Sequence, residues 1–300
     1  MSLATFGYAA GWRLVRMLPD RTARALFRFG ADQAAKRNGP GVRQLRANLT
    51  RVVPQAGEEE LDDLVRESLR SYARYWCEAF RLPSMDLKDV YTRCDDLVTG
   101  QENLDAALAE GTGAIIALPH SGNWDMAGVW LVGHSGTFTT VAERLKPESL
   151  YRKFVEFRET LGFEVLPLNG GELPPATILK QRLRDNKVVC LLGDRDLTSS
   201  GVPVNFFGEQ TLMPAGPAHL SAQTGAALLP VGCWFTEDGW GFRIHPPIKT
   251  GNVNAATQAL ADVFAADIAA HPADWHMLQK LWLNDLPESK RKALARRRAS

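Results

Sequence analysis

Apolar runs and segments with helical spacing alternate along the chain from about residue 90, and no other feature constrains its fold as strongly. Runs typical of strands fall near residues 90–98, 113–118, 137–142, 163–166, 188–193, 227–235 and 240–245. Segments with helical spacing fall near residues 101–110, 123–133, 147–161, 173–186, 213–224 and 253–271. This alternation predicts an α/β fold with a central, partly parallel β-sheet flanked by α-helices. The turn residues Glu237-Asp238-Gly239 predict a hairpin between the last two strands, so we expect a mixed sheet.

The first 54 residues have a different pattern. Residues 2–18 and 20–36 carry large apolar side chains at helical spacing, with arginines on another face of the second segment. This opposition is typical of helices that lie in a membrane interface, although such helices also pack on their own domain. Helices are expected again at 42–53 and 58–80. We therefore predict an N-terminal amphipathic, membrane-associating helical region (1–54), an α/β domain (55–288) and a basic C-terminal tail (289–300).

The net charge of +1 conceals a strong segregation of charge. Residues 1–53 hold ten Arg and Lys against two Asp, and residues 290–300 hold six basic residues and no acidic one. Two basic ends on an acidic body predict attachment to an anionic membrane surface. Nucleic acid is the rival polyanion, but the acidic body and the lack of a recognised binding motif disfavour it. No run of 18 apolar residues appears, so we expect no membrane span.

The stretch Leu118-Pro119-His120-Ser121-Gly122-Asn123-Trp124-Asp125 follows a buried-strand pattern and precedes a helical one. Five positions on a helix amount to roughly 500°, so His120 and Asp125 converge only if the histidine lies in the turn. A neutral imidazole held by a carboxylate can take a proton from an alcohol. Unpaired backbone N–H groups at the start of the helix suit a developing negative charge. A buried histidine with one structural hydrogen bond is the alternative.

These residues also carry a family resemblance. His120-x4-Asp125 resembles the signature of glycerolipid and lipid A acyltransferases, which move acyl chains from a thioester to a hydroxyl. The longer string is similar to the lipid A biosynthesis (lauroyl/myristoyl) acyltransferase family, above all to its actinobacterial members that acylate phosphatidylinositol mannosides. The likeness runs from about Leu45 to Leu286. It implies a glycerolipid-acyltransferase-like fold, an acyl-CoA donor, a phosphoinositide glycolipid acceptor, and no cofactor or metal.

A second group of charged residues, Asp194-Arg195-Asp196, follows the strand predicted at 188–193. Sites in α/β sheets gather at the carboxyl ends of strands. The resemblance places an acidic residue here, close to the motif histidine, so Asp194 is the predicted partner of His120. Asp125 would then share that role or hold the turn through backbone N–H groups. A surface ion-pair cluster is the alternative.

Three further segments supply the predicted substrate contacts. Glu143 and Arg144, with Arg158 on the next helix, could pin a loop beside the site or bind phosphate, and a buried Glu143–Arg158 ion pair is equally consistent with the sequence. The segment from Val204 to Gly216 is predicted to be an apolar loop that enters a helix. It resembles the family's border of the acyl-chain channel, so Phe206 and Phe207 join the predicted substrate contacts, together with Ser121 and Arg195.

Four cysteines lie far apart without metal-ligand spacing, which indicates reduced thiols and a cytosolic environment. No cysteine or serine other than Ser121 sits beside His120. We therefore expect direct transfer of the acyl group, without an acyl-enzyme. Together with the charge pattern, the resemblance implies a peripheral O-acyltransferase at the cytoplasmic face of the plasma membrane, with a long-chain acyl group as the cargo and a mannose hydroxyl as the acceptor. An ester or thioester hydrolase and a non-catalytic lipid-binding protein are the alternatives.

Overall fold

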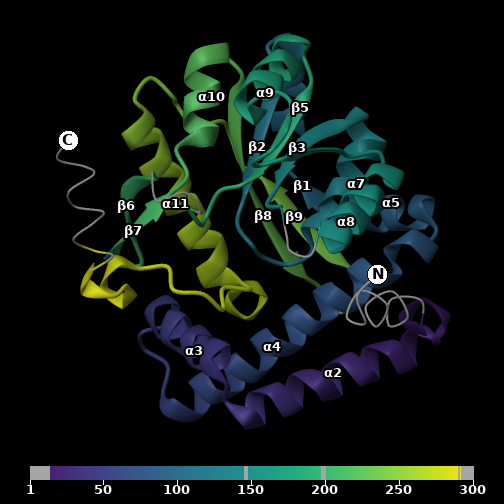
Figure 1. Cartoon of the computed structure of the whole chain (residues 1–300), viewed down its shortest axis with the longest axis vertical. Helices are drawn as coiled ribbons and strands as arrows, with labels where there is room; N and C mark the ends of the chain where they lie inside the picture. Colours follow the sequence, from purple (N-terminus) through teal and green to yellow (C-terminus); the bar gives the residue numbers. More distant parts are fainter. Residues whose placement is uncertain (1–13, 145–147, 197–200, 290, 292–300) are drawn as a thin grey trace.

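A seven-stranded β-sheet runs through the centre of the computed structural model, which describes residues 14–144, 148–196, 201–289 and 291 (Figure 1). Its order is β1-β9-β8-β2-β5-β3-β4. The strands are β1 (Val98–Thr99), β2 (Ala114–Leu118), β3 (Phe138–Ala142), β4 (Glu164–Pro167), β5 (Val188–Leu192), β8 (Ala227–Phe235) and β9 (Trp240–Ile244). The neighbouring strands from β8 to β4 are parallel, whereas β9 is antiparallel to β8. The predicted mixed sheet, with its hairpin at β8 and β9, is confirmed.

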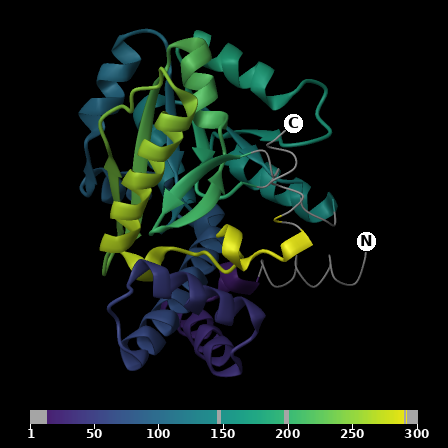
Figure 2. The ribbon, with the colours of Figure 1, turned by 90° about the vertical axis from the view of Figure 1, so that its left-hand side faces the viewer.

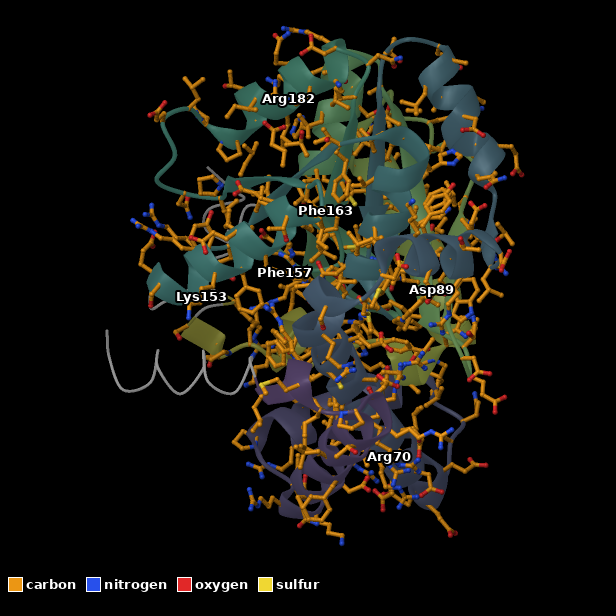
Figure 3. The ribbon with its side chains drawn as sticks, turned by 90° about the vertical axis from the view of Figure 1, so that its right-hand side faces the viewer. Arg70, Asp89, Lys153, Phe157, Phe163 and Arg182 are labelled. Atoms are coloured by element: carbon orange, nitrogen blue, oxygen red, sulfur yellow. The ribbon has the colours of Figure 1, made fainter. Side chains whose placement is uncertain are left out.

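Helices cover both faces of the sheet, so every residue of the central strand β2 is buried. On one face Ile115 and Ala117 share a core with α9 (Pro175–Arg184), α10 (Gly216–Thr224) and α11 (Val253–Ala270). The helices of the other face are α5 (Leu87–Asp95), α6 (Gln101–Ala109), α7 (Trp124–Ser135) and α8 (Glu148–Thr160). Phe157 and Phe163 belong to this second core (Figure 3). The predicted α/β architecture is therefore confirmed.

A separate helical layer lies across one end of the sheet (Figures 1 and 2). It consists of α2 (Asp20–Arg37), α3 (Pro40–Val52) and α4 (Glu58–Arg81), and the sequence predicted a helix in each of these three stretches. Leu61, Val65 and Leu69 of α4 lie at helical spacing and pack with α3 in a small core of their own. No helix in the described ranges has both the length and the apolar character needed to cross a bilayer. Residues 1–13 and most of the basic tail lie outside the described residues.

Short elements connect these layers. They are the single-turn helices η1 (Leu82–Ser84), η2 (Pro272–Asp274) and η3 (Leu283–Asp285), and a two-stranded hairpin of β6 (Val202–Phe206) and β7 (Glu209–Met213). The segment that contains η2 passes between α4 and the carboxyl end of the sheet and contacts both. It therefore lies next to the predicted catalytic turn.

The strand predicted at 90–98 is wrong. Residues 87–95 form α5 instead, and only Val98 and Thr99 of that stretch belong to a strand. Asp86 caps the helix by accepting a hydrogen bond from the backbone N–H of Lys88. Val90 and Cys94, four positions apart, both point into the core. Residues four positions apart lie on the same face of a helix. Burial of this face decides for a helix, although valine and tyrosine have a high strand propensity.

The apolar loop predicted from Val204 is also wrong, because β6 and β7 form a hairpin there and α10 begins only at Gly216. Val202, Val204 and Phe206 are buried while the residues between them are exposed. This period of two is typical of a strand with one buried face. Phe207 and Gly208 both have positive φ (51° and 80°), as a tight hairpin turn requires.

Candidate active site

The turn between β2 and α7 carries His120. Asn123 caps α7 with its side-chain oxygen, which accepts a hydrogen bond from the backbone N–H of Met126 at 3.2 Å. Gly122 has φ +56°, and a Cβ there would approach the backbone of Cys233 and Trp234 to 2.8 Å. Only glycine fits both the conformation and the space. The sequence Ser121-Gly122-Asn123 thus bends the chain directly after the strand and aims His120 across its carboxyl end.

Asp194 holds the imidazole of His120. Nδ1 of His120 and Oδ1 of Asp194 lie 2.6 Å apart, and the backbone N–H of His120 donates to Oδ2 at 3.0 Å. A carboxylate is an acceptor only, so Nδ1 carries the proton and Nε2 is left with a lone pair. Within the described residues, no hydrogen bond engages Nε2. The side chain of His120 is 29% exposed, so this nitrogen is available to a ligand.

Asp194 is fully buried at the carboxyl end of β5. Burial alone would raise its pKa, but the neighbouring His120 and the hydrogen bonds from His120 and Trp275 bring the pKa below its ordinary value. The indole N–H of Trp275 donates to Oδ2 at 3.1 Å. Asp194 is therefore ionised at neutral pH, and both of its oxygens are fixed in place.

Asp125 has other partners. Arg158 donates to it through Nε at 2.9 Å and through Nη2 at 3.4 Å, and the hydroxyl of Tyr75 donates to Oδ2 at 3.1 Å. Burial lowers the pKa of Arg158, but the charge of Asp125 outweighs it and the net pKa is raised. Burial and the same carboxylate raise the pKa of Tyr75. The ion pair considered between Glu143 and Arg158 is thus replaced by one between Asp125 and Arg158.

A segment from the far end of the chain holds the turn in place. The backbone N–H of His276 donates to the carbonyl of His120 at 2.8 Å, and that of Gly122 donates to the carbonyl of Asp274 at 2.9 Å. Ser71 Oγ lies 2.7 Å from Asp274 Oδ1 and 2.9 Å from Nε2 of the buried His276. Burial, and to a lesser extent His120, lower the pKa of His276 to about 3, so this second imidazole is neutral.

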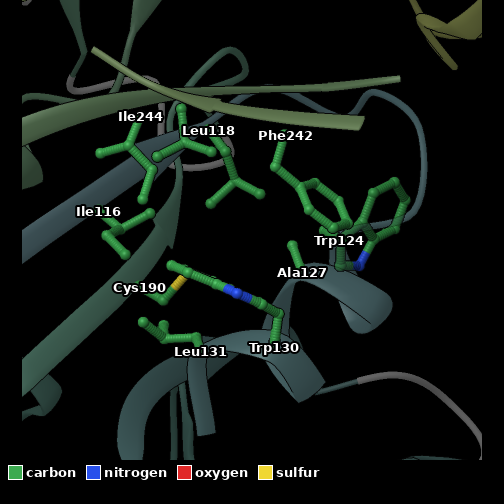
Figure 4. A pocket seen from close by; sticks show the side chains of 11 residues that line it. Ile116, Leu118, Trp124, Ala127, Trp130, Leu131, Cys190, Phe242 and Ile244 are labelled. Atoms are coloured by element: carbon green, nitrogen blue, oxygen red, sulfur yellow. The ribbon is translucent and has the colours of Figure 1, made fainter. Parts of the chain in front are cut away.

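An apolar cavity lies between α7 and the sheet (Figure 4). Its volume is about 20 Å³, room for about one water molecule, so the cavity is narrow. Its walls come from β2, β5, β8, β9 and α7 and include Ile116, Leu131 and Phe242. Trp124 also lines it, and the ring of Trp124 meets that of His120 edge to face with centroids 5.7 Å apart. The imidazole therefore stands one side chain away from an apolar cavity.

The sequence comparisons agree with this geometry. The family model for bacterial lipid A biosynthesis acyltransferases matches residues 2–284. The chain belongs to this family. A phosphatidylinositol mannoside acyltransferase of Mycolicibacterium smegmatis is 61% identical over 96% of this chain and 94% of the relative. One from Mycobacterium tuberculosis is 58% identical over 97% of this chain and 92% of the relative. The predicted family is thus confirmed, and the protein is an acyltransferase.

The structure brings only some of the predicted substrate-binding residues to this acyltransferase site. Arg158 lies at the site because it pairs with Asp125. Ser121 is buried next to His120, and its Oγ has no hydrogen-bond partner in the described residues. Arg195 follows Asp194 and is partly buried, with no ion pair in the described part of the chain. Within the described residues, no group of three or more His, Cys, Asp or Glu side chains is placed to hold a metal ion.

The other predicted residues lie elsewhere. Glu143 is exposed, and Arg144 pairs with Glu148 on α8, with Nε to Oε2 at 2.8 Å. Phe206 is buried in the core on the opposite face of the sheet from the apolar cavity, and Phe207 packs against the same core. These two phenylalanines do not line the cavity, because the hairpin turns them toward Trp275.

Sequence reasoning did not identify four residues that contact the turn or its acidic residues, namely Tyr75, Asp274, Trp275 and His276. Trp275 and Asp194 are 81 positions apart, and Tyr75 and Asp125 are 50 apart. No local pattern encodes such contacts. The one available signal is the run Asp274-Trp275-His276, in which three side chains with polar groups follow one another shortly after α11.

Proposed function

We propose that this acyltransferase moves a long, palmitoyl-like acyl group from acyl-CoA to a mannose hydroxyl of a phosphatidylinositol mannoside. The observation that carries the proposal is an imidazole fixed by a buried carboxylate beside an apolar cavity. The donor and the acceptor are inferred by likeness, since relatives that are 61% and 58% identical carry the name phosphatidylinositol mannoside acyltransferase. Acyl transfer from a thioester needs neither a metal nor a redox cofactor.

In the proposed reaction, Nε2 of His120 takes the proton of the acceptor hydroxyl while the hydroxyl oxygen attacks the thioester carbonyl carbon. The carbon–sulfur bond then breaks, and the coenzyme A thiolate receives the proton from His120. Asp194 fixes the tautomer and stabilises the imidazolium that forms between these steps. We assign stabilisation of the oxyanion to the backbone N–H groups of Trp124 and Asp125 at the start of α7, which have no partner among the described residues.

Direct transfer fits the site better than an acyl-enzyme. Cys190 lines the apolar cavity, but burial raises the pKa of its thiol to about 12, so it is not a thiolate at neutral pH. Ser121 is adjacent to His120 in sequence, yet its Oγ has no hydrogen bond to the imidazole that would activate it. The acceptor hydroxyl itself is therefore the proposed nucleophile.

We assign the apolar cavity to the acyl chain. Its walls are aliphatic and aromatic, and its position next to Trp124 would place the thioester carbonyl near His120. Burial of the chain stabilises the complex by about 0.8 kcal/mol per methylene group. Because the cavity is narrow, we expect the chain to spread its walls as it enters.

We further propose that the protein binds peripherally to the anionic cytoplasmic face of the plasma membrane. The described N-terminal residues expose Leu14, Met17, Leu26 and Phe29, and arginines alternate with these apolar residues. Apolar side chains next to basic ones suit the boundary between acyl chains and anionic headgroups. A cytoplasmic site also agrees with the four free cysteines and with an acyl-CoA donor.

The test is an assay of lipid products by mass spectrometry, with acyl-CoA and a panel of mannosylated and phosphorylated acceptors. We expect the purified protein to acylate a phosphatidylinositol mannoside and His120→Ala to lose on the order of 10²–10⁴ of the turnover. His219→Ala is the matched control, because His219 is exposed on α10 far along the chain from the turn.

Other outcomes would contradict the proposal. Free fatty acid released at the same rate without any acceptor would show a hydrolase. Full turnover in His120→Ala would remove the proposed base. Binding of lipid without turnover in the unaltered protein would indicate a lipid-binding protein instead.

A further inference from the structure

A second cavity lies on the other side of the catalytic turn, between α2, α4 and the segment that contains η2. Its volume is about 350 Å³, and it is partly open to solvent. Four arginines line it, Arg24, Arg28, Arg70 and Arg74, and we call it the arginine cavity. Figure 3 shows Arg70 in the helical layer. No step of the proposed reaction uses this cavity.

Three of these arginines are held rigidly by carboxylates. Arg70 donates to both oxygens of Asp32, at 2.6 and 3.0 Å. Arg24 pairs with Asp20 at 2.7 Å, and Arg74 with the buried Glu78 at 2.8 Å. Arg70 also donates to Glu67, Arg24 also lies 3.5 Å from Glu78, and Arg74 also donates to two backbone carbonyls. Each guanidinium has five N–H donors, so those that remain can meet a ligand. Pinning also lowers the entropy lost when the ligand binds.

Arg28 differs from the other three. It is exposed, and within the described residues it forms no ion pair. The carboxylates beside the four guanidinium groups are those of Asp20, Asp32, Glu67, Glu78 and Asp274. A ligand is therefore held by directed N–H donors and not by an excess of positive charge. With the hydrogen bond from Arg70, the charge of Arg28 helps to lower the pKa of Asp32. No hydrogen bond in the described residues engages the N–H groups of Arg28, so they can bind a phosphate with two parallel hydrogen bonds.

The remaining groups of the lining suit hydroxyls. Ser71 lies 2.7 Å from Asp274, and the other carboxylate oxygen of Asp274 accepts from the backbone N–H of Phe235 at 2.9 Å. The guanidinium of Arg74 lies 4.2 Å from the centre of the Phe235 ring. Carboxylates repel a bare phosphate but accept hydrogen bonds from hydroxyl groups. Together with the arginines they select a phosphate that carries a polyol.

The wall of the arginine cavity that contains Asp274, here called its floor, is hydrogen-bonded to the catalytic turn. Asp274 lines the cavity, and its carbonyl accepts the N–H of Gly122 at 2.9 Å. The next residue, Trp275, donates to Asp194 at 3.1 Å. A group bound on this floor thus lies against the segment that fixes both His120 and its carboxylate.

We propose that the arginine cavity binds the phosphorylated polyol headgroup of the acceptor lipid. The proposal rests on the proposed function and adds the site for one part of its acceptor. Phosphatidylinositol in the surrounding membrane has the same headgroup chemistry, so an experiment has to separate the two sources.

The test compares two acceptors in detergent solution, a phosphatidylinositol mannoside and an alkyl mannoside that lacks inositol and phosphate. We expect Arg28→Glu to raise the ratio of the KM for the phosphorylated acceptor to that for the alkyl mannoside about tenfold or more, as loss of a charge-assisted hydrogen bond predicts. Arg21→Glu is the control, because Arg21 is exposed on the same helix and does not line the cavity. An unchanged ratio in Arg28→Glu, or an equal rise in Arg21→Glu, overturns the proposal.

Calorimetric titration with myo-inositol 1-phosphate separates this proposal from the proposed function. Binding that is present in the unaltered protein and in Arg21→Glu but lost in Arg28→Glu supports the cavity even if no acceptor is acylated. Absence of binding to the unaltered protein overturns it. A defect of Arg28→Glu confined to binding of phosphatidylinositol vesicles, with normal KM values, assigns the cavity to membrane lipid and overturns the assignment to the acceptor.

Discussion

Asp194 lies 2.6 Å from the imidazole of His120 and is itself removed from solvent, so its charge acts on the ring almost unscreened. Asp194→Asn keeps the shape and a carbonyl oxygen but removes the charge. We expect turnover to fall on the order of 10²–10⁴, because the imidazolium loses its counter-charge and the tautomer is no longer fixed. Steady-state kinetics test this, with Glu143→Gln as the exposed control. An unchanged rate would show that His120 does not depend on the charge of Asp194.

The pairing of His120 with Asp194 is a contact that the sequence suggested, since both residues follow strands that were recognisable as buried runs. The strands β2 and β5 are parallel neighbours, with Leu118 opposite Leu192, so the residues that follow them meet. The partners of Asp125 were not predictable in the same way. Tyr75 and Arg158 come from α4 and α8, and their approach depends on how two helices pack over the sheet.

His276 is expected to make the stability of the fold depend on pH. Its pKa is lowered to about 3 in the folded protein, against an ordinary value of 6.5. Between these values the unfolded chain binds one proton more than the folded chain, so stability falls as the pH falls. The slope amounts to about 1.4 kcal/mol per pH unit. The loss ends below the folded pKa, where both states are protonated.

His276→Gln keeps a donor for Ser71 and removes the titration. We expect the free energy of unfolding to fall between pH 7 and pH 5 by about 2 kcal/mol less in this variant than in the unaltered protein. Urea unfolding followed by tryptophan fluorescence measures the difference, and Asp274 titrates in both proteins and so cancels. Parallel pH curves for the two proteins would contradict the prediction.

At the scale of elements, the β2–α7 turn is the most constrained part of the fold. Gly122→Ala places a methyl group 2.8 Å from backbone atoms of β8 in a conformation that favours glycine. We expect a loss of stability of roughly 2 kcal/mol or more, because the turn or β8 has to move. Turnover should fall as well, since the same turn carries His120.

Gly225→Ala is the matched control for this prediction. Gly225 also has positive φ (80°), in the left-handed helical region at the end of α10, but no atom lies within 4 Å of an added Cβ. It should lose only about 1 kcal/mol, the conformational part of the effect. Equal losses in urea unfolding for the two variants would show that the close approach to β8 contributes nothing.

Long elements with a regular period were predictable, and short ones with mixed signals were not. The continuous apolar run of β2 and the stripe Leu61, Val65 and Leu69 of α4 each have one period and one burial partner. The stretch 87–99 contains β-branched and aromatic residues, but packing of Val90 and Cys94 four positions apart decides for a helix. In β6 the alternation spans only five residues, so the turn at Phe207 and Gly208 was needed to recognise the hairpin.

At the scale of the whole molecule, charge and exposed apolar surface coincide. Four of the eight large apolar side chains that are exposed in the described residues lie within residues 14–29. Residues 1–53 also carry a large excess of arginine and lysine. The helices α2 and α3 of this region lie together at one end of the molecule (Figure 2). A membrane would therefore meet both features on the same layer.

Membrane binding through this layer should have two separable components. Leu26→Gln with Phe29→Gln removes apolar surface and keeps every charge, so binding to anionic vesicles should weaken at least about tenfold, given about 1.5–3 kcal/mol for each fully buried side chain. Raising the salt from 0.1 M to 1 M shortens the Debye length from about 10 Å to about 3 Å and should weaken binding of both proteins alike. Sedimentation with vesicles measures both effects.

The pair Leu97→Gln with Leu173→Gln is the control for this prediction, because both side chains are exposed and lie outside the N-terminal layer. If the two double variants bind vesicles equally, the exposed side chains of α2 do not enter the membrane. If salt has no effect while the α2 variant binds more weakly, apolar insertion alone holds the protein and the basic charge serves another purpose. Weaker vesicle binding both in the α2 variant and at high salt would support attachment of this layer to the bilayer, where the acceptor lies. The same layer supplies α4, which contacts η2 beside the catalytic turn. Attachment in this orientation would therefore bring the acceptor within reach of His120.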